Sequence, residues 1–166
     1  MTNSPAARGH EARRDRFGEE HRHDSYKLQG KLTEPTVCPT CSAVFHKGRW
    51  SWATAPVGAQ ETVCPACRRV QDKCPKGVLM LKGAFASQQP EQVTGVIKNI
   101  ETKENKEHPL ARIMSIETTP DGLVVSTTDS HLPRQIAEAL KHAYQGELDI
   151  HYGEGEDSVR VNWTKS

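Results

Sequence analysis

The sequence has few aromatic side chains, which make up 5 % of its 166 residues, and hydrophobic residues of all kinds reach only 35 %. This fraction of apolar residues is low for one large hydrophobic core. The length favours one medium domain or two small domains beside a tail. No apolar run approaches the ~18 residues that a membrane span needs, and no apolar stretch follows the first charges as in a secretory signal. We therefore expect a cytoplasmic protein with no membrane partner, in which thiols stay reduced.

The compact motifs of common enzymes are also missing. The sequence contains no phosphate-binding Gly-rich loop, no nucleophile elbow and no metalloprotease motif. Asp129 lies near the start of a predicted helix, where a role as cap or dipole partner is a better interpretation than general base. We assign no catalytic residues and expect a protein that is not an enzyme.

Charge is balanced overall and uneven along the chain. The 22 basic and 21 acidic residues give a net charge of +1. Residues 1–31 have a net charge of +2, residues 32–83 of +4 and residues 84–166 of −5. The basic N-terminal half and the acidic C-terminal half predict a polyanionic partner for the N-terminal half.

The residue types divide the chain into three segments. Residues 1–32 are polar and charged, and we expect a disordered tail because such a segment buries too little surface to offset chain entropy. Residues 33–83 hold all five cysteines and two of the three tryptophans. Residues 84–166 carry helical and alternating apolar patterns and are expected to form a separate acidic α+β domain.

The patterns in the last segment predict its architecture. Apolar residues recur at helical spacing over residues 93–100 and 132–144. Two short apolar segments flank the turn signal Pro120-Asp121-Gly122, and alternation over residues 148–152 and 159–163 is typical of strands with one buried face. The order α-β-β-α-β-β predicts an antiparallel four-stranded sheet covered by two helices.

Two C-P-x-C knuckles characterise the middle segment. Cys38 and Cys41 form the first, Cys64 and Cys67 form the second, and 22 residues separate them. Each knuckle points two thiolates at one cation, and two knuckles complete the tetrahedron that structural Zn²⁺ accepts. We predict a four-cysteine zinc ribbon whose metal supplies much of the folding energy. Four thiolate ligands leave no position open for a catalytic water.

Other uses of the cysteines stay open. A C-P-x-C motif is also typical of a thiol-disulfide redox protein or sensor, although that chemistry usually occurs in a βαβ context that neither knuckle has. Cys74 is the odd cysteine and is expected to be a spare thiol rather than a ligand. A protein-binding zinc adaptor is a further alternative, and so is a DNA-binding regulator, although no recognition helix stands out.

Basic and aromatic side chains surround the two knuckles. Such side chains contact phosphates while bases stack on the rings, and the local excess of basic groups favours RNA contact. Alternatively, Phe45 and at least one tryptophan form a small core beside the metal, and Lys47 and Arg49 are simply a solvated hairpin tip. The predicted RNA-binding residues are His46, Lys47, Arg49, Trp50, Arg68 and Arg69.

Several motifs of this sequence resemble those of a known family. They lie at residues 36–41, 44–50, 64–67, 108–114 and 139–148. The family is a group of small bacterial zinc-ribbon proteins related to the ribosomal adaptor named after nonsense-mediated decay. Its members often carry the label NMD protein affecting ribosome stability and mRNA decay.

The resemblance to the bacterial group covers roughly residues 33–164 and is fairly specific, whereas the resemblance to the ribosomal adaptor itself is looser and rests mainly on the two knuckles. It implies a zinc ribbon with Cys38, Cys41, Cys64 and Cys67 as ligands, no catalytic residues, and contact with the ribosome or another structured RNA. It therefore predicts a non-enzymatic protein that affects ribosome or mRNA stability. The acidic C-terminal domain is expected to engage a protein partner or to limit nonspecific adhesion.

Overall fold

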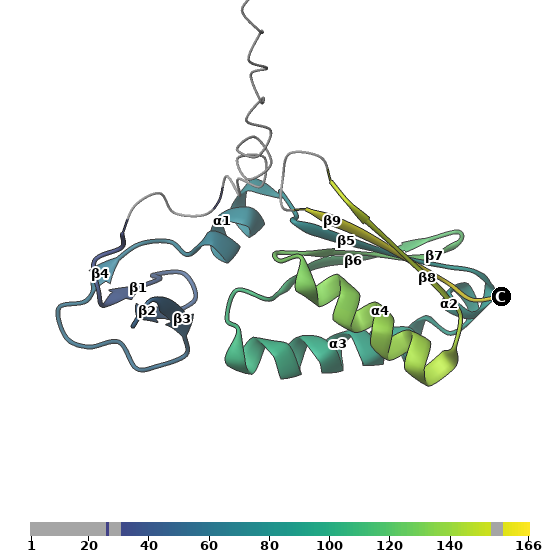
Figure 1. Cartoon of the computed structure of the whole chain (residues 1–166), viewed down its shortest axis with the longest axis horizontal. Coiled ribbons are helices and arrows are strands. Elements are labelled where there is room, and N and C mark those ends of the chain that lie inside the picture. Colours follow the sequence, from purple (N-terminus) through teal and green to yellow (C-terminus); the bar gives the residue numbers. More distant parts are fainter. Residues whose placement is uncertain (1–25, 27–30, 154–157) are drawn as a thin grey trace, which may run out of the picture.

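The computed structural model describes Tyr26, residues 31–153 and residues 158–166. Its elements form two parts along the long axis of the molecule (Figure 1): a small sheet followed by one helix, and a larger sheet packed against helices. The predicted disordered tail, residues 1–32, lies outside the described residues except for Tyr26, Lys31 and Leu32.

The small sheet has the strand order β3-β2-β1-β4. Strand β1 (Thr36–Val37) pairs antiparallel with β2 (Val44–His46) and parallel with β4 (Gln60–Glu61). Strand β3 (Arg49–Ser51) completes the predicted hairpin with β2. Both turn residues between β2 and β3 have positive φ, the conformation that a tight two-residue hairpin turn requires.

The second knuckle opens a helix, α1 (Pro65–Asp72), which the sequence analysis did not predict. Cys64 is its N-cap, and the Cys64 sulfur accepts a hydrogen bond from the N–H of Cys67. Pro65 stands in the first turn, where its fixed φ suits a helix and its missing N–H costs nothing. The helix ends at Lys73, which has the left-handed conformation with φ 52°. A predicted metal ligand thus also starts the helix.

The larger sheet has the strand order β6-β7-β5-β9-β8. Its strands are β5 (Gly77–Lys82), β6 (Ile113–Thr119), β7 (Gly122–Thr127), β8 (Glu147–Tyr152) and β9 (Val159–Thr164). Neighbouring strands run antiparallel except β5 and β9, which are parallel. The sheet is therefore mixed.

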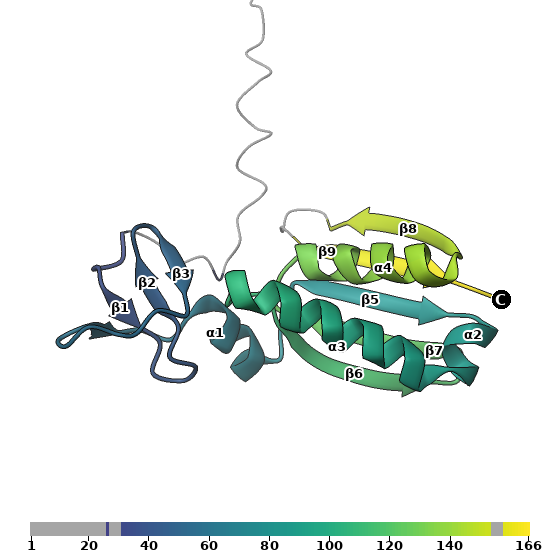
Figure 2. The same ribbon diagram turned by 90° about the horizontal axis from the view of Figure 1, so that it is seen from below.

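Helices cover one face of this sheet (Figure 2). The long helices α3 (Pro90–Glu107) and α4 (His131–Tyr144) pack against each other, and the short α2 (Ala84–Gln88) packs against β5 and β7. Helix α3 ends before His108-Pro109, as predicted, because the residue before a proline avoids the helical conformation.

The core of the larger part lies between the sheet and the helices. Strands β5 and β9 bury alternate residues, and Trp163 has no exposed surface despite its size. Burial of each large apolar side chain contributes about 1.5–3 kcal/mol. The largest core side chains are Trp163, Leu79, Leu81, Ile97, Leu132, Ile136 and Leu140.

The α+β class is confirmed, and residues 84–166 follow the order α-β-β-α-β-β apart from the short additional helix α2. The predicted boundary at residue 84 and the predicted antiparallel four-stranded sheet differ from the structure. The prediction assigned residues 33–83 to the ribbon, but β5 is the central strand of the larger sheet. The boundary expected at residue 84 therefore separates this strand from its own sheet. The sheet is also not purely antiparallel, because the β8–β9 hairpin returns β9 alongside β5 in the same direction.

The other predicted elements of the C-terminal segment are present, with small shifts at their ends. The hairpin turns between β6 and β7 at Pro120-Asp121, and the last two strands pair as expected. Asp129 accepts the N–H of Leu132 at 3.1 Å, which is a capping interaction at the start of α4. No helix among the described residues combines the length and apolar character needed to cross a lipid bilayer.

Candidate metal centre

The structure brings the four predicted ligands into one cluster. Cys38 and Cys41 lie in the turn between β1 and β2, which is closed by hydrogen bonds from Cys38 N to Ala43 O and from Ser42 N to Cys38 O, both at 2.8 Å. Cys64 and Cys67 lie at the start of α1. All four sulfur atoms are within 4.8 Å of one another, and none forms a disulfide. The cluster is thus positioned to bind one metal ion.

Backbone N–H groups point at the sulfur atoms. Cys64 N donates to Cys38 Sγ at 3.3 Å, and Cys67 N donates to Cys64 Sγ at 3.4 Å. Cys38 and Cys64 have no exposed surface and Cys67 is 4 % exposed, whereas Cys41 is partly exposed. Donors of this kind stabilise negative charge on sulfur and fix the orientation of each ligand.

Burial and hydrogen bonding act in opposite directions on the thiols. Burial raises the pKa of Cys38, but backbone N–H groups, chiefly that of Cys64, outweigh it and lower this pKa to about 6. Burial raises the pKa of Cys64 more than the Cys67 N–H and Arg112 lower it, and it raises the pKa of Cys67 against the effect of Arg112. A metal cation among the sulfur atoms would supply the positive charge that favours the thiolate forms of Cys64 and Cys67.

Arg112 reaches the cluster from the segment before β6. Its guanidinium donates to Cys67 Sγ and to Cys41 Sγ, each at 3.1 Å, and approaches Cys64 Sγ at 3.6 Å. Burial lowers the pKa of Arg112, but the bonds to Cys67 and Cys41 outweigh it and raise this pKa above its ordinary value. The charged group is therefore held against three of the four ligands.

Further contacts fix Arg112 in place. Its Nε donates to Pro109 O at 2.8 Å, and its backbone N–H donates to Thr128 Oγ1 at 3.0 Å. Trp52 lies with its ring 5.9 Å from the guanidinium and donates from Nε1 to Asn105 O at 2.6 Å. A cavity of about 480 Å³ lies beside these groups. The N-terminal part and the α3–β6 connection thus meet at the metal centre.

The sequence analysis gave Arg112 no role. The residue is 71 positions from Cys41 and 45 from Cys67, so no local motif links it to the knuckles. Its signals in the sequence are its place in the motif at residues 108–114 and just after the His-Pro pair that ends α3, and neither points to the cysteines.

The predicted RNA-binding residues occupy different environments. His46, Lys47 and Arg49 are exposed on the β2–β3 hairpin, and Arg68 is exposed on α1. Trp50 is partly buried and packs against the cysteine cluster and against Phe45, with ring centroids 5.5 Å apart. Trp50 thus belongs to a small core beside the cysteines, which is the alternative to RNA contact given in the sequence analysis.

Arg69 is not available at the surface, contrary to its predicted role. It is 6 % exposed, donates from Nη1 to Cys74 O at 3.1 Å, and has its guanidinium 4.1 Å from the ring centroid of Tyr26. Tyr26 in turn donates from its hydroxyl to Asp72 Oδ2 at 2.9 Å. Arg69 therefore holds α1 to flanking segments, and one residue of the predicted tail contacts the folded body.

A carboxylate lies at the hairpin tip. Glu34 accepts the backbone N–H of Lys47 at 3.1 Å and that of Gly48 at 2.9 Å. These bonds fix the turn and place one negative charge beside the exposed basic side chains. Cys74, the fifth cysteine, is partly buried and lies outside the group of four.

Comparison with known proteins adds no relative. No model of a protein family matches the chain, and a search of curated proteins gives no significant match. The resemblance described above therefore rests on the sequence motifs alone.

Proposed function

We propose that the chain is a zinc-binding, non-enzymatic protein that associates with RNA, first of all the RNA of the ribosome, through its N-terminal part. The observation that carries the proposal is the group of four cysteine sulfurs, with Arg112 held against them. The exposed basic residues of the β2–β3 hairpin supply the RNA contact.

The sulfur geometry supports zinc as the metal. Tetrahedral Zn²⁺ with Zn–S bonds of about 2.3 Å has sulfur–sulfur edges of about 3.8 Å. Cys41 Sγ and Cys64 Sγ are 3.8 Å apart. Thiolates are soft ligands that favour zinc over magnesium or calcium. Protein sulfur fills every position of such a site, so its role is structural.

Arg112 fits the charge of the loaded site. Zinc with four thiolates carries a net charge of about −2, and such a charge is costly at a partly buried position unless it is compensated. A guanidinium does not lose its proton in a protein, so Arg112 offsets one of these charges permanently. The loaded centre also fastens the N-terminal part to the segment before β6, which gives zinc a second structural role.

The exposed cations support the RNA contact. With Arg69 buried, the side chains that remain accessible are His46, Lys47, Arg49 and Arg68. Lysine and arginine on a hairpin tip reach phosphate oxygens without a deep groove. Trp50 belongs to the packing around the cysteines, so base stacking on this ring is not part of the proposal.

Binding of ribosomal RNA as a function of salt tests the proposal. The zinc-loaded full chain is expected to bind with an affinity that falls steeply as salt rises, because each neutralised phosphate releases counterions. Lys47→Ala/Arg49→Ala should make the log–log slope shallower by about 1.4, since each contact contributes roughly 0.7 on single strands. The matched control is Lys98→Ala/Lys103→Ala, which removes two exposed cations from α3.

Zinc content and melting temperature are measured alongside for every variant. A hairpin variant that keeps zinc and fold and binds ribosomal RNA as well as the unmodified chain would overturn the RNA part of the proposal. In that case a protein-binding zinc adaptor becomes the better interpretation.

A further inference from the structure

Strand β8 forms one edge of the larger sheet. In the order β6-β7-β5-β9-β8 it has β9 on one side, and none of the described strands pairs with its other side. Figure 2 shows β8 as the outermost strand, beside α4. The outer N–H and C=O groups of such a strand are a template for pairing with another chain. This edge lies outside the metal centre and plays no part in the function proposed above.

The two edges of the larger sheet differ in regularity. Strand β8 pairs with β9 without interruption from Glu147 to Tyr152. Strand β6, at the opposite edge, has a register shift between Ile113 and Ser115, and the N–H of Ile113 donates to Glu101 Oε1 at 2.9 Å. Bulges and side-chain bonds of this kind protect an edge strand from pairing with another chain. Strand β8 is therefore the edge better suited to such pairing.

The hydrogen-bond ladder shows which backbone groups of β8 face outward. Gly153 N donates to Ser158 O at 3.0 Å, at the turn end of the β8–β9 hairpin. Along an antiparallel strand, residues alternate between bonding to the neighbouring strand and pointing away from it. Leu148, Ile150 and Tyr152 each stand an odd number of residues before Gly153. They therefore direct their N–H and C=O groups away from β9.

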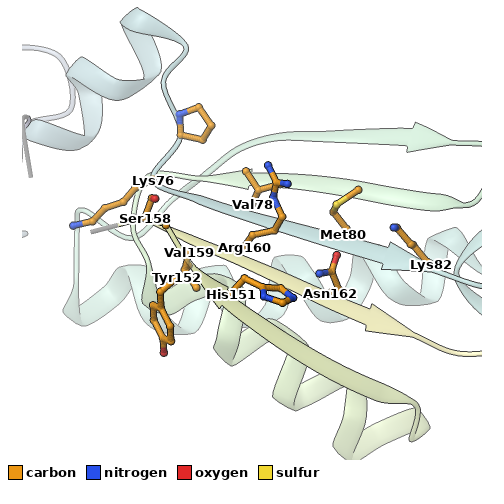
Figure 3. Close-up of a pocket in the computed structure, with 12 residues that line it drawn as sticks. Lys76, Val78, Met80, Lys82, His151, Tyr152, Ser158, Val159, Arg160 and Asn162 are labelled. Carbon is orange, nitrogen blue, oxygen red and sulfur yellow. The ribbon is translucent and has the colours of Figure 1, made fainter. Parts of the chain in front are cut away.

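The side chains of β8 divide between the two faces of the sheet. Leu148 and Ile150 are partly buried and pack against the core on the helix side. Alternation places Tyr152, which is 65 % exposed, on the same face. Asp149 and His151 are exposed on the other face, where they lie 2.7 Å apart. Figure 3 shows the ring of His151 over the open face and the ring of Tyr152 pointing away from it.

A second copy of β8 matches the outward backbone groups. In an antiparallel pair whose two-fold axis passes through Ile150, this residue faces Ile150 of the second copy. Leu148 then faces Tyr152 of the second copy, and Tyr152 faces Leu148. Each outward N–H and C=O of these three residues meets a partner. The facing side chains on the helix side are apolar or aromatic, which is a favourable combination across two strands.

The charged side chains select the same register. Asp149 faces His151 of the second copy, so each carboxylate lies near the imidazole of its own strand and that of the other. Glu147 faces Gly153, which carries no charge. A shift of one step toward the start of β8 would place Asp149 opposite Asp149, and a shift of two steps would place it opposite Glu147. Like charges that face each other destabilise a strand pair, so the axis at Ile150 is favoured.

We propose that the chain forms a symmetric dimer in which β8 pairs antiparallel with β8 of a second copy. The two five-stranded sheets then continue into each other across the axis. Two strands of six residues make a small interface, so the dimer is expected to be weak, with a dissociation constant on the order of 100 µM. The interface uses neither the metal centre nor the basic hairpin.

Two substitutions at Tyr152 test the pairing. Tyr152→Pro removes an outward N–H and leaves the ladder with β9 complete, and an edge strand tolerates proline where its N–H faces outward. Tyr152→Ala removes the same side chain and keeps the N–H, so it is the matched control. Self-association of the zinc-loaded full chain is measured by sedimentation equilibrium at concentrations on both sides of the expected dissociation constant. Nuclease treatment beforehand ensures that RNA does not bridge two copies.

The unmodified chain is expected to pass from one to two copies per particle as its concentration rises. Tyr152→Pro should associate about tenfold more weakly than Tyr152→Ala, because each dimer loses two hydrogen bonds between the copies. A chain that stays monomeric throughout overturns the proposal. Equal association of the two variants, with equal melting temperatures, also overturns it.

Charge variants test the register and do not require that proline be tolerated. His151→Asp places carboxylates opposite each other in its own dimer, and Asp149→Lys places basic groups opposite each other. Each variant alone is expected to associate several-fold more weakly than the unmodified chain. In an equimolar mixture the acidic groups of one variant face the basic groups of the other, so association should be restored. A mixture that associates no better than the separate variants overturns the proposed dimer and leaves the RNA proposal intact.

Discussion

The two parts of the molecule are stabilised by different means. The buried cluster of the larger part consists of aliphatic side chains and Trp163, which helices and sheet enclose together. The buried cluster around the knuckles has four members, and three of them are cysteines: Cys38, Cys64 and Cys67, with Ala66. In the proposed function, a part with so small an apolar core depends on a bound metal, whereas the larger part depends on hydrophobic burial.

This contrast is useful because the two parts also share a contact. Arg112 belongs to the larger part by its place before β6 and to the smaller part by its hydrogen bonds to sulfur. Changes that remove the metal, the central strand or this arginine therefore have separable effects.

Removal of β5 is expected to abolish folding of the larger part. A fragment of residues 84–166 lacks the strand that pairs with both β7 and β9 and contributes Leu79 and Leu81 to the core. A fragment of residues 75–166 keeps it and is expected to fold. Circular dichroism and thermal unfolding of the two fragments distinguish them. Cooperative unfolding of the shorter fragment at the same temperature would contradict the central position of β5.

Cys64→Ser is expected to unfold the N-terminal part alone. The substitution removes a buried metal ligand that is also the N-cap of α1, and the metal supplies much of the folding energy of such a segment. Zinc content should fall to near zero, and protease should cut within residues 31–74 while residues 75–166 stay intact. Cys74→Ser, outside the cluster, is the matched control and should keep its zinc. Equal protection in both variants would refute the dependence on metal.

Arg112→Met is expected to leave the ligands in place and to loosen the metal. Loss of groups that support metal ligands typically costs about 10–100-fold in metal affinity, so zinc should pass to a competing chelator faster than in the unmodified chain. Arg68→Ala removes an exposed arginine beside Cys67 and serves as control. Identical transfer rates for both variants would show that Arg112 contributes nothing to the centre.

Asp129→Asn is expected to raise the melting temperature slightly at pH 7. Burial raises the pKa of Asp129, although the N–H of Leu132 opposes this. Folding therefore favours the protonated carboxyl group. The folded chain loses stability as the pH rises above the pKa that Asp129 has in the unfolded chain. Asparagine keeps an acceptor for the cap without the charge, whereas Asp129→Ala loses the cap and costs about 1 kcal/mol. Thermal unfolding at pH 7 and pH 4 measures both effects. The gain from asparagine should shrink at the lower pH, and a larger gain there would contradict this assignment.

The sequence predicted what local spacing determines. The two C-P-x-C knuckles predicted the cysteine cluster, and apolar periodicity predicted α3, α4, β8 and β9. The turn signal at residues 120–122 predicted the β6–β7 hairpin. The apolar run of β5 stands between Gly77 and Lys82, and such a run is typical of a strand buried in a sheet. It was assigned to the ribbon because it follows the cysteines closely, while its partners β7 and β9 are far along the chain.

The remaining differences arise from contacts between distant residues. Arg69 and Arg68 are neighbours in sequence, and only the helical geometry of α1 buries one and exposes the other. Arg112 meets the cysteines because the chain after α3 lies beside them. Sequence patterns do not encode contacts between residues that are distant along the chain. The predicted set of RNA-binding residues therefore includes the buried Arg69, and Arg112 at the cysteine cluster has no predicted role.

In the proposed function, one zinc ion held by four thiolates organises the N-terminal part. Thiol titration of the native full chain, combined with metal analysis before and after a chelator, is the decisive experiment. We expect about one zinc per chain, reaction of Cys74 alone before chelation, and reaction of the four ligand thiols only after zinc is removed. A chain without zinc whose five thiols react together would contradict it.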